Sequence, residues 1–286
     1  MLTLREIFDE DLEDVYCFLS ENLNPGVPLD VWRLAFNRSW MPEKPNNGFM
    51  LLVNDTVVGV LCALYAQRQT QDGIRNVCNT STWFVLDAYR SHSLKLMLAI
   101  LDQKGFFFTS LSTSPEVYEL HRHLKFRSYI TTLVAIPNLP KLNYFSEKLE
   151  ILIDPGPISK CLDAYIKQIS IDHMDIPTIQ QVVFRTSDET LLVIFDIRTV
   201  RGVRATNIFY LSNPDMFYQN QNEICSYFLS NNHTLFTLIH RCSMSKVPAL
   251  SLEIKRNIAL FYNGDITELS FPEFIYSEHM FFHSGR

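Results

Sequence analysis

The chain has 286 residues, of which 47% are hydrophobic, and its 31 acidic and 25 basic residues give a net charge of −6 at pH 7. This length exceeds the usual domain size of about 100–150 residues and predicts one large or two medium domains with real cores. The acidic balance supplies no global basic field, so we expect neither nucleic acid nor an anionic membrane as a partner.

The first half begins with an alternating strand, LTLREI, followed by a helix from Glu10 to Leu23 with Asp9 as its N-cap. A second helix begins at DVWRLAF. FMLLV and VVGVLCALYAQRQ, joined by the polar turn NDT, then read as a β-hairpin. A third strand is expected from Val77 to Leu86, and a helix from Leu94 to Gln103 follows a short polar turn.

The first half ends with a strand in FFFTSLSTS, a helix in SPEVYELHRHL and a further short strand in FRSYITTLVAI. Ser114 is the expected N-cap of that helix, with Pro115 at its first position. PNLPKLNYF reads as a linker.

The second half repeats this order of elements with little residue identity. QVVFRTSD and ETLLVIFDI resemble the hairpin, and VRATNIFYLS resembles the third strand. We expect a helix in QNEICSYFLS, a strand in TLFTLIHRC, a short helix in PALSLEIKR and a last strand in IALFYN. Residues 1–140 and 141–286 are therefore predicted to form two similar domains.

The six cysteines lie far apart, mostly in apolar runs, and form no CxxC pair. Buried free thiols in a reducing compartment explain them better than disulfides or a zinc site, and the histidines form no HExxH pattern. The N-terminus lacks the pattern of a signal peptide, and the longest apolar run falls short of the ~20 residues of a membrane helix. We expect a cytoplasmic protein without a metal.

Three segments carry a resemblance to a known family. WFVLDAYRSHSLKLML places a strand ending in Val before an aromatic residue, Arg and a short turn, and SPEVYELHRHLKF follows it. Together with the preceding hairpin, these segments resemble the GNAT superfamily of acyltransferases, which move acyl groups from acyl-CoA to an amine. The resemblance implies an α+β fold of two GNAT-like lobes, each a mixed, mostly antiparallel sheet flanked by helices, of which the second is degenerate.

The family's turn is rich in glycine, whereas this chain has serines there. A serine is small, and a helix start with free N–H groups favours a phosphate. The resemblance implies that the pantetheine arm and thioester carbonyl lie on backbone N–H groups of Val85 to Asp87. The expected acyl-CoA site comprises Val85, Leu86, Asp87, Arg90, Ser91, His92, Ser93, Leu94, Lys95 and Ser114. The second half has no such turn, so one acetyl-CoA is expected per chain.

Aminolysis of a thioester needs a proton for the departing thiolate. His121 takes the position of the family's proton-donating tyrosine and is the predicted general acid; Tyr118, one turn earlier, is the weaker candidate. The alternative for His121 is an exposed, solvated HRH patch. In the helical motif Lys125 stands where the family has glycine.

The third strand should face the acceptor, with Asn79, Ser81 and Trp83 on one side because side chains alternate along a strand. No carboxylate lies in that run, which leaves water, Glu278 or Asp265 as candidate general bases.

The sequence therefore predicts transfer of an acetyl or short acyl group to a primary amine of a small acceptor such as an amino sugar, with acyl-CoA as co-substrate. One alternative is a catalytically inactive GNAT-like module that binds CoA or a partner. The other is an aminoacyl-tRNA-dependent peptide-bond-forming transferase, which the acidic balance disfavours.

Overall fold

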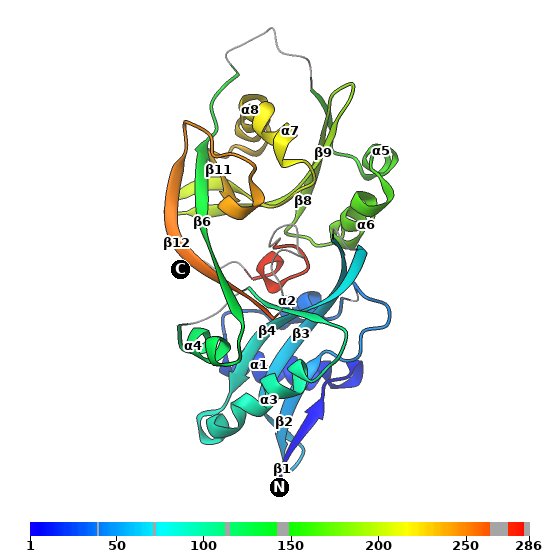
Figure 1. Ribbon diagram of the computed structural model, residues 1–286, viewed down its shortest axis with the longest axis vertical. Coiled ribbons are helices and arrows are strands. Elements are labelled where there is room, and N and C mark those ends of the chain that lie inside the picture. Colours follow the sequence, from blue (N-terminus) through cyan, green and yellow to red (C-terminus); the bar gives the residue numbers. More distant parts are fainter. Residues whose placement is uncertain (39, 71–72, 112–114, 142–148, 264–273, 283–286) are drawn as a thin grey trace. The chain divides into compact units, whose positions relative to one another are not determined.

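The computed structural model describes the chain apart from residues 39, 71–72, 112–114, 142–148, 264–273 and 283–286. The chain forms two compact units, and most of their helices and strands are labelled in Figure 1. Unit 1 contains Met1–Tyr129, Ala259–Ser270 and Tyr276–Phe282, and unit 2 contains Ile130–Ile258, Phe271–Ile275 and His283–Arg286. Neither unit is one continuous stretch of the chain.

Unit 1 is built on a mixed sheet with the strand order β1-β2-β3-β4-β5-β12, in which only β4 and β5 are parallel neighbours. Its elements are β1 (Leu2–Glu6), η1 (Asp9–Asp11), α1 (Leu12–Asn22), α2 (Leu29–Phe36), β2 (Gly48–Val53), β3 (Thr56–Thr70), β4 (Gly73–Val85), η2 (Asp87–His92), α3 (Ser93–Leu101), β5 (Phe107–Ser110), α4 (Pro115–His123), the end of β12 and η5 (Glu278–Met280).

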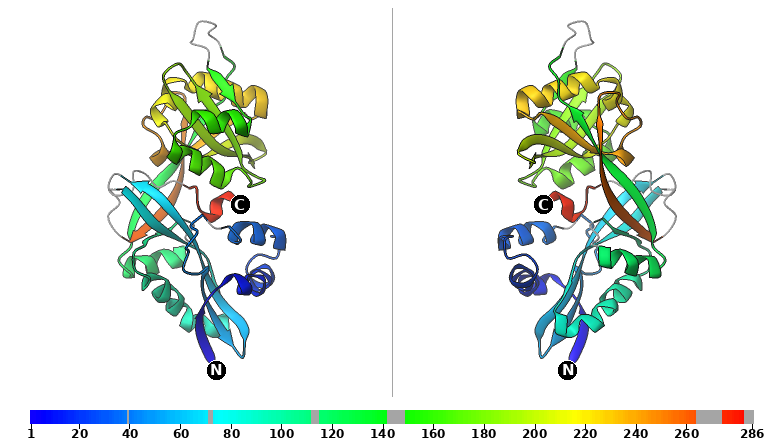
Figure 2. Two further views of the ribbon diagram at one scale, coloured as in Figure 1. Left: turned by 90° about the vertical axis from the view of Figure 1, so that its right-hand side faces the viewer. Right: turned by 90° about the vertical axis from the view of Figure 1, so that its left-hand side faces the viewer.

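Helices cover both faces of the unit 1 sheet. In Figure 2, α1 and α2 lie on one face, and α3 and α4 lie on the other. Helix α3 buries Leu96, Met97 and Ile100 against Leu51 and Phe108 of the sheet, because apolar residues three or four positions apart share one side of a helix. The sheet thereby acquires two separate packed surfaces.

Unit 2 repeats this arrangement, with the strand order β6-β11-β10-β9-β8-β7. Its elements are β6 (Arg127–Pro137), β7 (Glu150–Leu152), α5 (Pro155–Cys161), α6 (Ala164–His173), β8 (Gln180–Arg185), β9 (Thr190–Val200), β10 (Val203–Leu211), α7 (Pro214–Gln219), α8 (Gln221–Asn232), β11 (Phe236–His240), η3 (Arg241–Ser243) and the start of β12 (Leu252–Asn263). Strands β10 and β11 are parallel, as β4 and β5 are in unit 1. The predicted repetition of elements is confirmed apart from the helix expected between β11 and β12, where the described residues form only η3.

Three local expectations differ from the structure. The short helix predicted in PALSLEIKR is wrong, because Leu252 and Ile254 begin the long strand β12; their spacing has the period of two that is typical of strands. Asp9 is not the helix cap, since it accepts a hydrogen bond from Asn47 Nδ2 at 2.9 Å. Asp11 accepts instead from the Phe8 amide, at 2.9 Å. Helices α5 and α6 were not predicted.

The two units exchange their last strands. Strand β6 follows α4 in the sequence but pairs antiparallel with β11 of unit 2, Phe236 lying opposite Pro137. The strand beside β5 of unit 1 is the end of β12, where Phe261 lies opposite Ser110. Each sheet is therefore completed by a segment from the other half of the sequence. The predicted division between residues 140 and 141 falls in the connection from β6 to β7.

No helix among the described residues is both long and apolar enough to cross a membrane. The six cysteines are free thiols, and burial raises the pKa of the Cys62 and Cys78 thiols to about 12.

A fragment of residues 1–140 should fail to fold as a stable monomer. It leaves β5 without its β12 neighbour, and it leaves the rings of Trp32 and Phe36 without Phe282, which lies 4.7 and 6.4 Å from their centroids. An unpaired apolar edge strand promotes aggregation. Circular dichroism and sedimentation would measure this, and co-expression with residues 250–286 should restore a soluble complex. A monomeric fragment that unfolds as cooperatively as the whole chain would contradict the exchange.

Candidate functional site

The site is built where β4 separates from β5. The two strands pair over three positions only, from Val77 opposite Phe107 to Asn79 opposite Thr109. The hydroxyl of Thr80 donates to the Thr109 carbonyl at 3.1 Å, and β5 then ends at Ser110 while β4 continues to Val85. Past Asn79, no described strand pairs with this edge of β4. A gap between parallel strands leaves backbone groups available to a ligand.

A β-bulge lies in the separated part of β4. Leu61 of β3 pairs with Trp83 and Cys62 pairs with Ser81, so Thr82 is an extra residue without a partner in β3. Its φ of 52° is unusual for a β-branched residue, which indicates local strain. A bulge reverses the alternation of side chains that follows it.

The bulge corrects one expectation about the acceptor side. Trp83 packs with Cys78 and Val85 in the core under α3, whereas Phe84 contacts Phe18 of α1 at a centroid distance of 5.8 Å. Asn79 lies on the α1 side as well, by the alternation from Cys78. The prediction that Trp83 shares a side with Asn79 is therefore wrong.

The backbone of β4 presents donors to the open edge. The Leu86 amide donates to the Val58 carbonyl of β3 at 2.9 Å. Since successive N–H groups point to opposite sides of a strand, the Val85 amide points away from β3, and so does that of Trp83. Of the amides expected to contact acyl-CoA, that of Val85 is therefore directed at the open edge, whereas that of Leu86 is bonded to β3. The Trp83 amide was not predicted from the sequence.

The expected phosphate turn is the 3₁₀ helix η2, which leads directly into α3. Asp87, Arg90, Ser91, Leu94 and Lys95 are exposed. The Arg90 guanidinium lies 2.6 Å from the Asp87 carboxylate, and the carbonyl of Arg90 accepts the Ser93 amide. His92, Ser93 and Leu86 are half-buried, and Ser114 lies outside the described residues. Two exposed cations, Arg90 of η2 and Lys95 of α3, therefore lie within five residues of each other, and Arg90 is paired with Asp87.

His121 of α4 faces Trp83 from the α3 side of the sheet. Its ring is 1% exposed, lies edge-on to Trp83 at 6.4 Å and packs on Phe126 at 4.6 Å. Its Nδ1 donates to the Val117 carbonyl at 2.8 Å, and burial lowers the pKa of the imidazole. The alternative of an exposed patch is therefore wrong for His121, although His123 is exposed. Tyr118 packs against the same core.

Helix α4 ends as the sequence pattern implies. Lys125 has a φ of 64°, a conformation that favours glycine. The Lys125 amide donates to the Arg122 carbonyl and the Phe126 amide to the His121 carbonyl, the two bonds of a Schellman motif. This ending directs Phe126 back onto the His121 ring.

Asn79 meets a carboxylate from the C-terminal segment of unit 1. Its Nδ2 donates to Glu278 Oε2 at 2.6 Å, and its Oδ1 accepts from the Thr109 hydroxyl at 3.0 Å. Asn79, Ser81 and Glu278 are all buried. Asp265, the other carboxylate considered from the sequence, lies outside the described residues.

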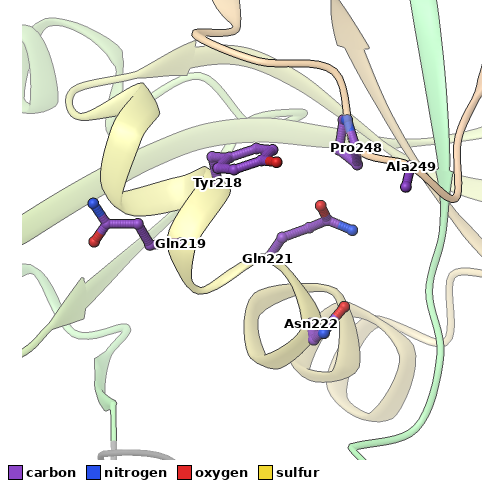
Figure 3. A pocket seen from close by; sticks show the side chains of 6 residues that line it. All are labelled: Tyr218, Gln219, Gln221, Asn222, Pro248 and Ala249. Atoms are coloured by element: carbon purple, nitrogen blue, oxygen red, sulfur yellow. The ribbon is translucent and has the colours of Figure 1, made fainter.

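Unit 2 keeps the same break in its sheet. Strand β10 is parallel to β11 as far as Ile208, and the register with β9 then shifts so that Phe209 is extra. Helices α7 and α8 follow, and a cavity of about 250 Å³ lies at their junction (Figure 3). It is lined by Tyr218, Gln219, Gln221, Asn222, Pro248 and Ala249. Among the described residues of the chain, no cluster of His, Cys, Asp and Glu could hold a metal ion.

Solved structures share this architecture. A GCN5-related N-acetyltransferase from Anabaena variabilis superposes with a TM-score of 0.64 over 92% of this chain and 72% of its own, at 10% identity. The chain has the GNAT fold. A GCN5-related N-acetyltransferase from Kribbella flavida also superposes on the chain, with a TM-score of 0.63 over 92% of this chain and 70% of its own, at 14% identity.

A third match is a GCN5-related glucosamine N-acetyltransferase region in a fungal multi-domain GH3 beta-N-acetylglucosaminidase. Its TM-score is 0.58 over 92% of this chain and 38% of the other, at 12% identity. No family model matches the chain, and no curated protein does. At such identities the likeness establishes the fold alone. The predicted α+β class with two GNAT-like lobes is confirmed.

The buried His121 ring should make stability depend on pH. Because burial lowers its pKa in the folded state, the unfolded chain binds the proton more readily, near the ordinary histidine value of about 6.5. This contribution to the free energy of unfolding is fully present above about pH 6.5 and is lost progressively as the pH falls from there through the lower pKa of the folded state. The wild type should lose free energy of unfolding relative to His121→Phe between pH 7.5 and 5 in urea titrations. His123→Phe is the control, and parallel curves for all three proteins would contradict the assignment.

Proposed function

We propose that unit 1 transfers an acetyl or other short acyl group from acyl-CoA to a primary amine of a small acceptor. The observation that carries the proposal is the separation of β4 from β5 at a strained bulge. It leaves the Trp83 and Val85 amides directed at an open edge, where two N–H donors suit a thioester carbonyl that gains negative charge.

The residues around this edge are compatible with acyl-CoA. Trp83 Nε1 is buried, and no described residue accepts a hydrogen bond from it, so it can donate to a ligand. Arg90 and Lys95 are exposed beside the start of α3, where their charges suit a pyrophosphate. Ser91 and Ser93 are small enough to let a phosphate approach, although they lack the freedom of glycine.

His121 is the proposed proton donor to the departing thiolate. Because Nδ1 already holds its hydrogen against the Val117 carbonyl, a donated proton must come from Nε2 of the cationic ring. Burial disfavours that cation. A developing thiolate next to the ring would favour it, since an opposite charge raises the pKa of an imidazole. Tyr118 is the second candidate for donating this proton to the thiolate.

Asn79 and Ser81 are the proposed contacts for the acceptor. The fungal structure is described as a glucosamine N-acetyltransferase region, which supports an amino sugar as the first acceptor to test. The rival function is a CoA-binding module without catalysis, which the burial and lowered pKa of His121 favour.

Acetyl-CoA should bind at one site per chain, and both Arg90→Ala and Ser93→Glu should weaken it. Losing a charge-assisted hydrogen bond costs about 1.5–3 kcal/mol, and the new carboxylate of Ser93→Glu would repel phosphate more strongly. Isothermal titration calorimetry measures affinity and stoichiometry. Lys160→Ala, a change on α5 of unit 2, is the control. Unchanged affinity in both variants, or two sites per chain, would overturn this assignment.

Replacing His121 by Phe should leave acetyl-CoA affinity nearly unchanged and lower turnover by about 10²–10⁴-fold, the usual effect of removing a general acid. His121→Tyr should recover part of the rate, because a phenol can also donate a proton. Thiol release with a panel of amines measures both. If His121→Phe turns over as fast as the wild type, His121 is only a packing residue. If the wild-type protein binds acetyl-CoA but acylates none of the amines, the inactive module is favoured.

A further inference from the structure

A carboxylate reaches the acceptor side of β4 from a distant part of the sequence. Glu278 is 199 positions after Asn79, yet its Oε2 accepts the Asn79 amide at 2.6 Å. Asn79 is in turn oriented by the Thr109 hydroxyl at 3.0 Å, at the last paired position of β4 and β5. The carboxylate is therefore fixed by two neighbouring strands where they separate.

The segment that carries Glu278 is firmly packed on unit 1. Phe282 contacts Trp32 and Phe36 of α2, and Phe281 and Tyr276 contact Trp40. His279 Nε2 lies 3.0 Å from the Leu111 carbonyl, just after β5. Tyr276 is held at a φ of 59°, which such packing can enforce. Glu278 itself is 5% exposed.

The reaction under Proposed function requires a base that this strand does not contain. A primary alkylamine is largely protonated at pH 7 and attacks a thioester only after losing that proton. Between Val77 and Val85, β4 carries no carboxylate and no histidine. Among the described residues, Glu278 supplies a carboxylate hydrogen-bonded to this stretch.

We propose that Glu278 is the general base that deprotonates the acceptor amine, and that Asn79 is a positioning residue for it. This inference rests on the proposed acyl transfer. The carboxylate takes one proton from the ammonium group, directly or through one water, and the freed nitrogen forms its bond to the thioester carbon. The carbon–sulfur bond then breaks, the nitrogen loses its second proton, and the thiolate takes one proton from His121 to become CoA–SH. Two protons leave the ammonium group and one is taken up by sulfur, so one net proton passes to solvent.

Because of the bulge at Thr82, the proposed base Glu278 and the proposed acid His121 lie on opposite sides of β4. Glu278 and Asn79 lie on the α1 side, whereas Trp83 and His121 lie on the α3 side. The amine would then approach the thioester from the α1 side, and the thiol would depart on the α3 side. The reaction would take place between them, at the open edge of β4. The titratable or charged groups that contact the segment carrying Glu278 include Arg68, which lies over the Tyr276 ring at 5.3 Å, and Arg38, which lies over the Phe281 ring at 5.7 Å, while His279 is the next residue of the segment itself.

The test compares two kinds of amine in Glu278→Gln. For a primary alkylamine, kcat/KM at pH 7 should fall by about 10²–10⁴-fold, the usual effect of a general base. For hydroxylamine, which is already neutral at pH 7, the loss should be less than tenfold. Glu278→Asp should recover part of the alkylamine rate. The difference in alkylamine rate between the wild type and Glu278→Gln should decrease as the pH rises, because more of the amine is then already neutral.

Asp11→Asn is the matched control, because Asp11 is also a buried carboxylate of unit 1, bonded to Arg5. Calorimetry with acetyl-CoA and circular dichroism confirm that each variant is folded. Equal losses for both amines in Glu278→Gln would show a merely structural role and overturn the inference, as would a wild-type alkylamine rate. If the wild type binds acetyl-CoA but acylates neither amine, the proposed acyl transfer fails first, and the base assignment falls with it.

Discussion

The single extra residue at Thr82 determines the geometry of the candidate site. Without it, β4 would present Trp83 on the side of Asn79, and the indole would not reach His121. With it, the strand carries polar groups that meet Glu278 on one side and aromatic groups that meet α4 on the other. A strained φ at a β-branched residue persists only where the surrounding structure enforces it. The pairing with β3 on both sides of Thr82 and the helices on both faces provide that enforcement.

The separation of β4 from β5 depends on how the sheet is completed. Strand β5 makes only three parallel pairs with β4 and takes its other partner from the end of the chain. The same C-terminal segment then continues to Tyr276–Phe282, which covers α2 and places Glu278 beside Asn79. Folding of unit 1 and assembly of its acceptor side are thus coupled, since one segment of chain serves both.

Unit 2 retains the framework of the same site without its side chains. The parallel pair, the strand bulge at Phe209 and the following helix are all present. The place that His121 and Trp83 occupy in unit 1 has no counterpart helix among the described residues, since only η3 follows β11 before β12. Unit 2 therefore shares the strand framework of unit 1, while the side chains described at the candidate site belong to unit 1.

The sequence by itself determined the elements that have a local signal. Two apolar runs joined by the polar turn NDT predicted the hairpin of β2 and β3, and Asn54 and Asp55 adopt the positive φ values that its two-residue turn requires. The helical motif placed Lys125 at the glycine-like end of α4, and the repeated order of elements predicted two similar lobes. The hairpin follows from neighbouring residues, the repeat from comparing the two halves of the chain, and the place of Lys125 from the resemblance to the family's motif, so none of them needs the tertiary structure.

Only the tertiary structure decided which strands pair, which side Trp83 faces and which carboxylate meets Asn79. Thr82 is an ordinary strand residue, and its bulge arises from the register with β3 rather than from its own preference. The periodicity of β6 and β12 reports that they are strands but carries no information about their partners, so their exchange between sheets could not be read from it. Glu278 meets Asn79 from 199 positions away, and His121 contacts Trp83 as well as its neighbours Val117 and Phe126, so the burial that lowers the pKa of His121 exists only once these segments have packed.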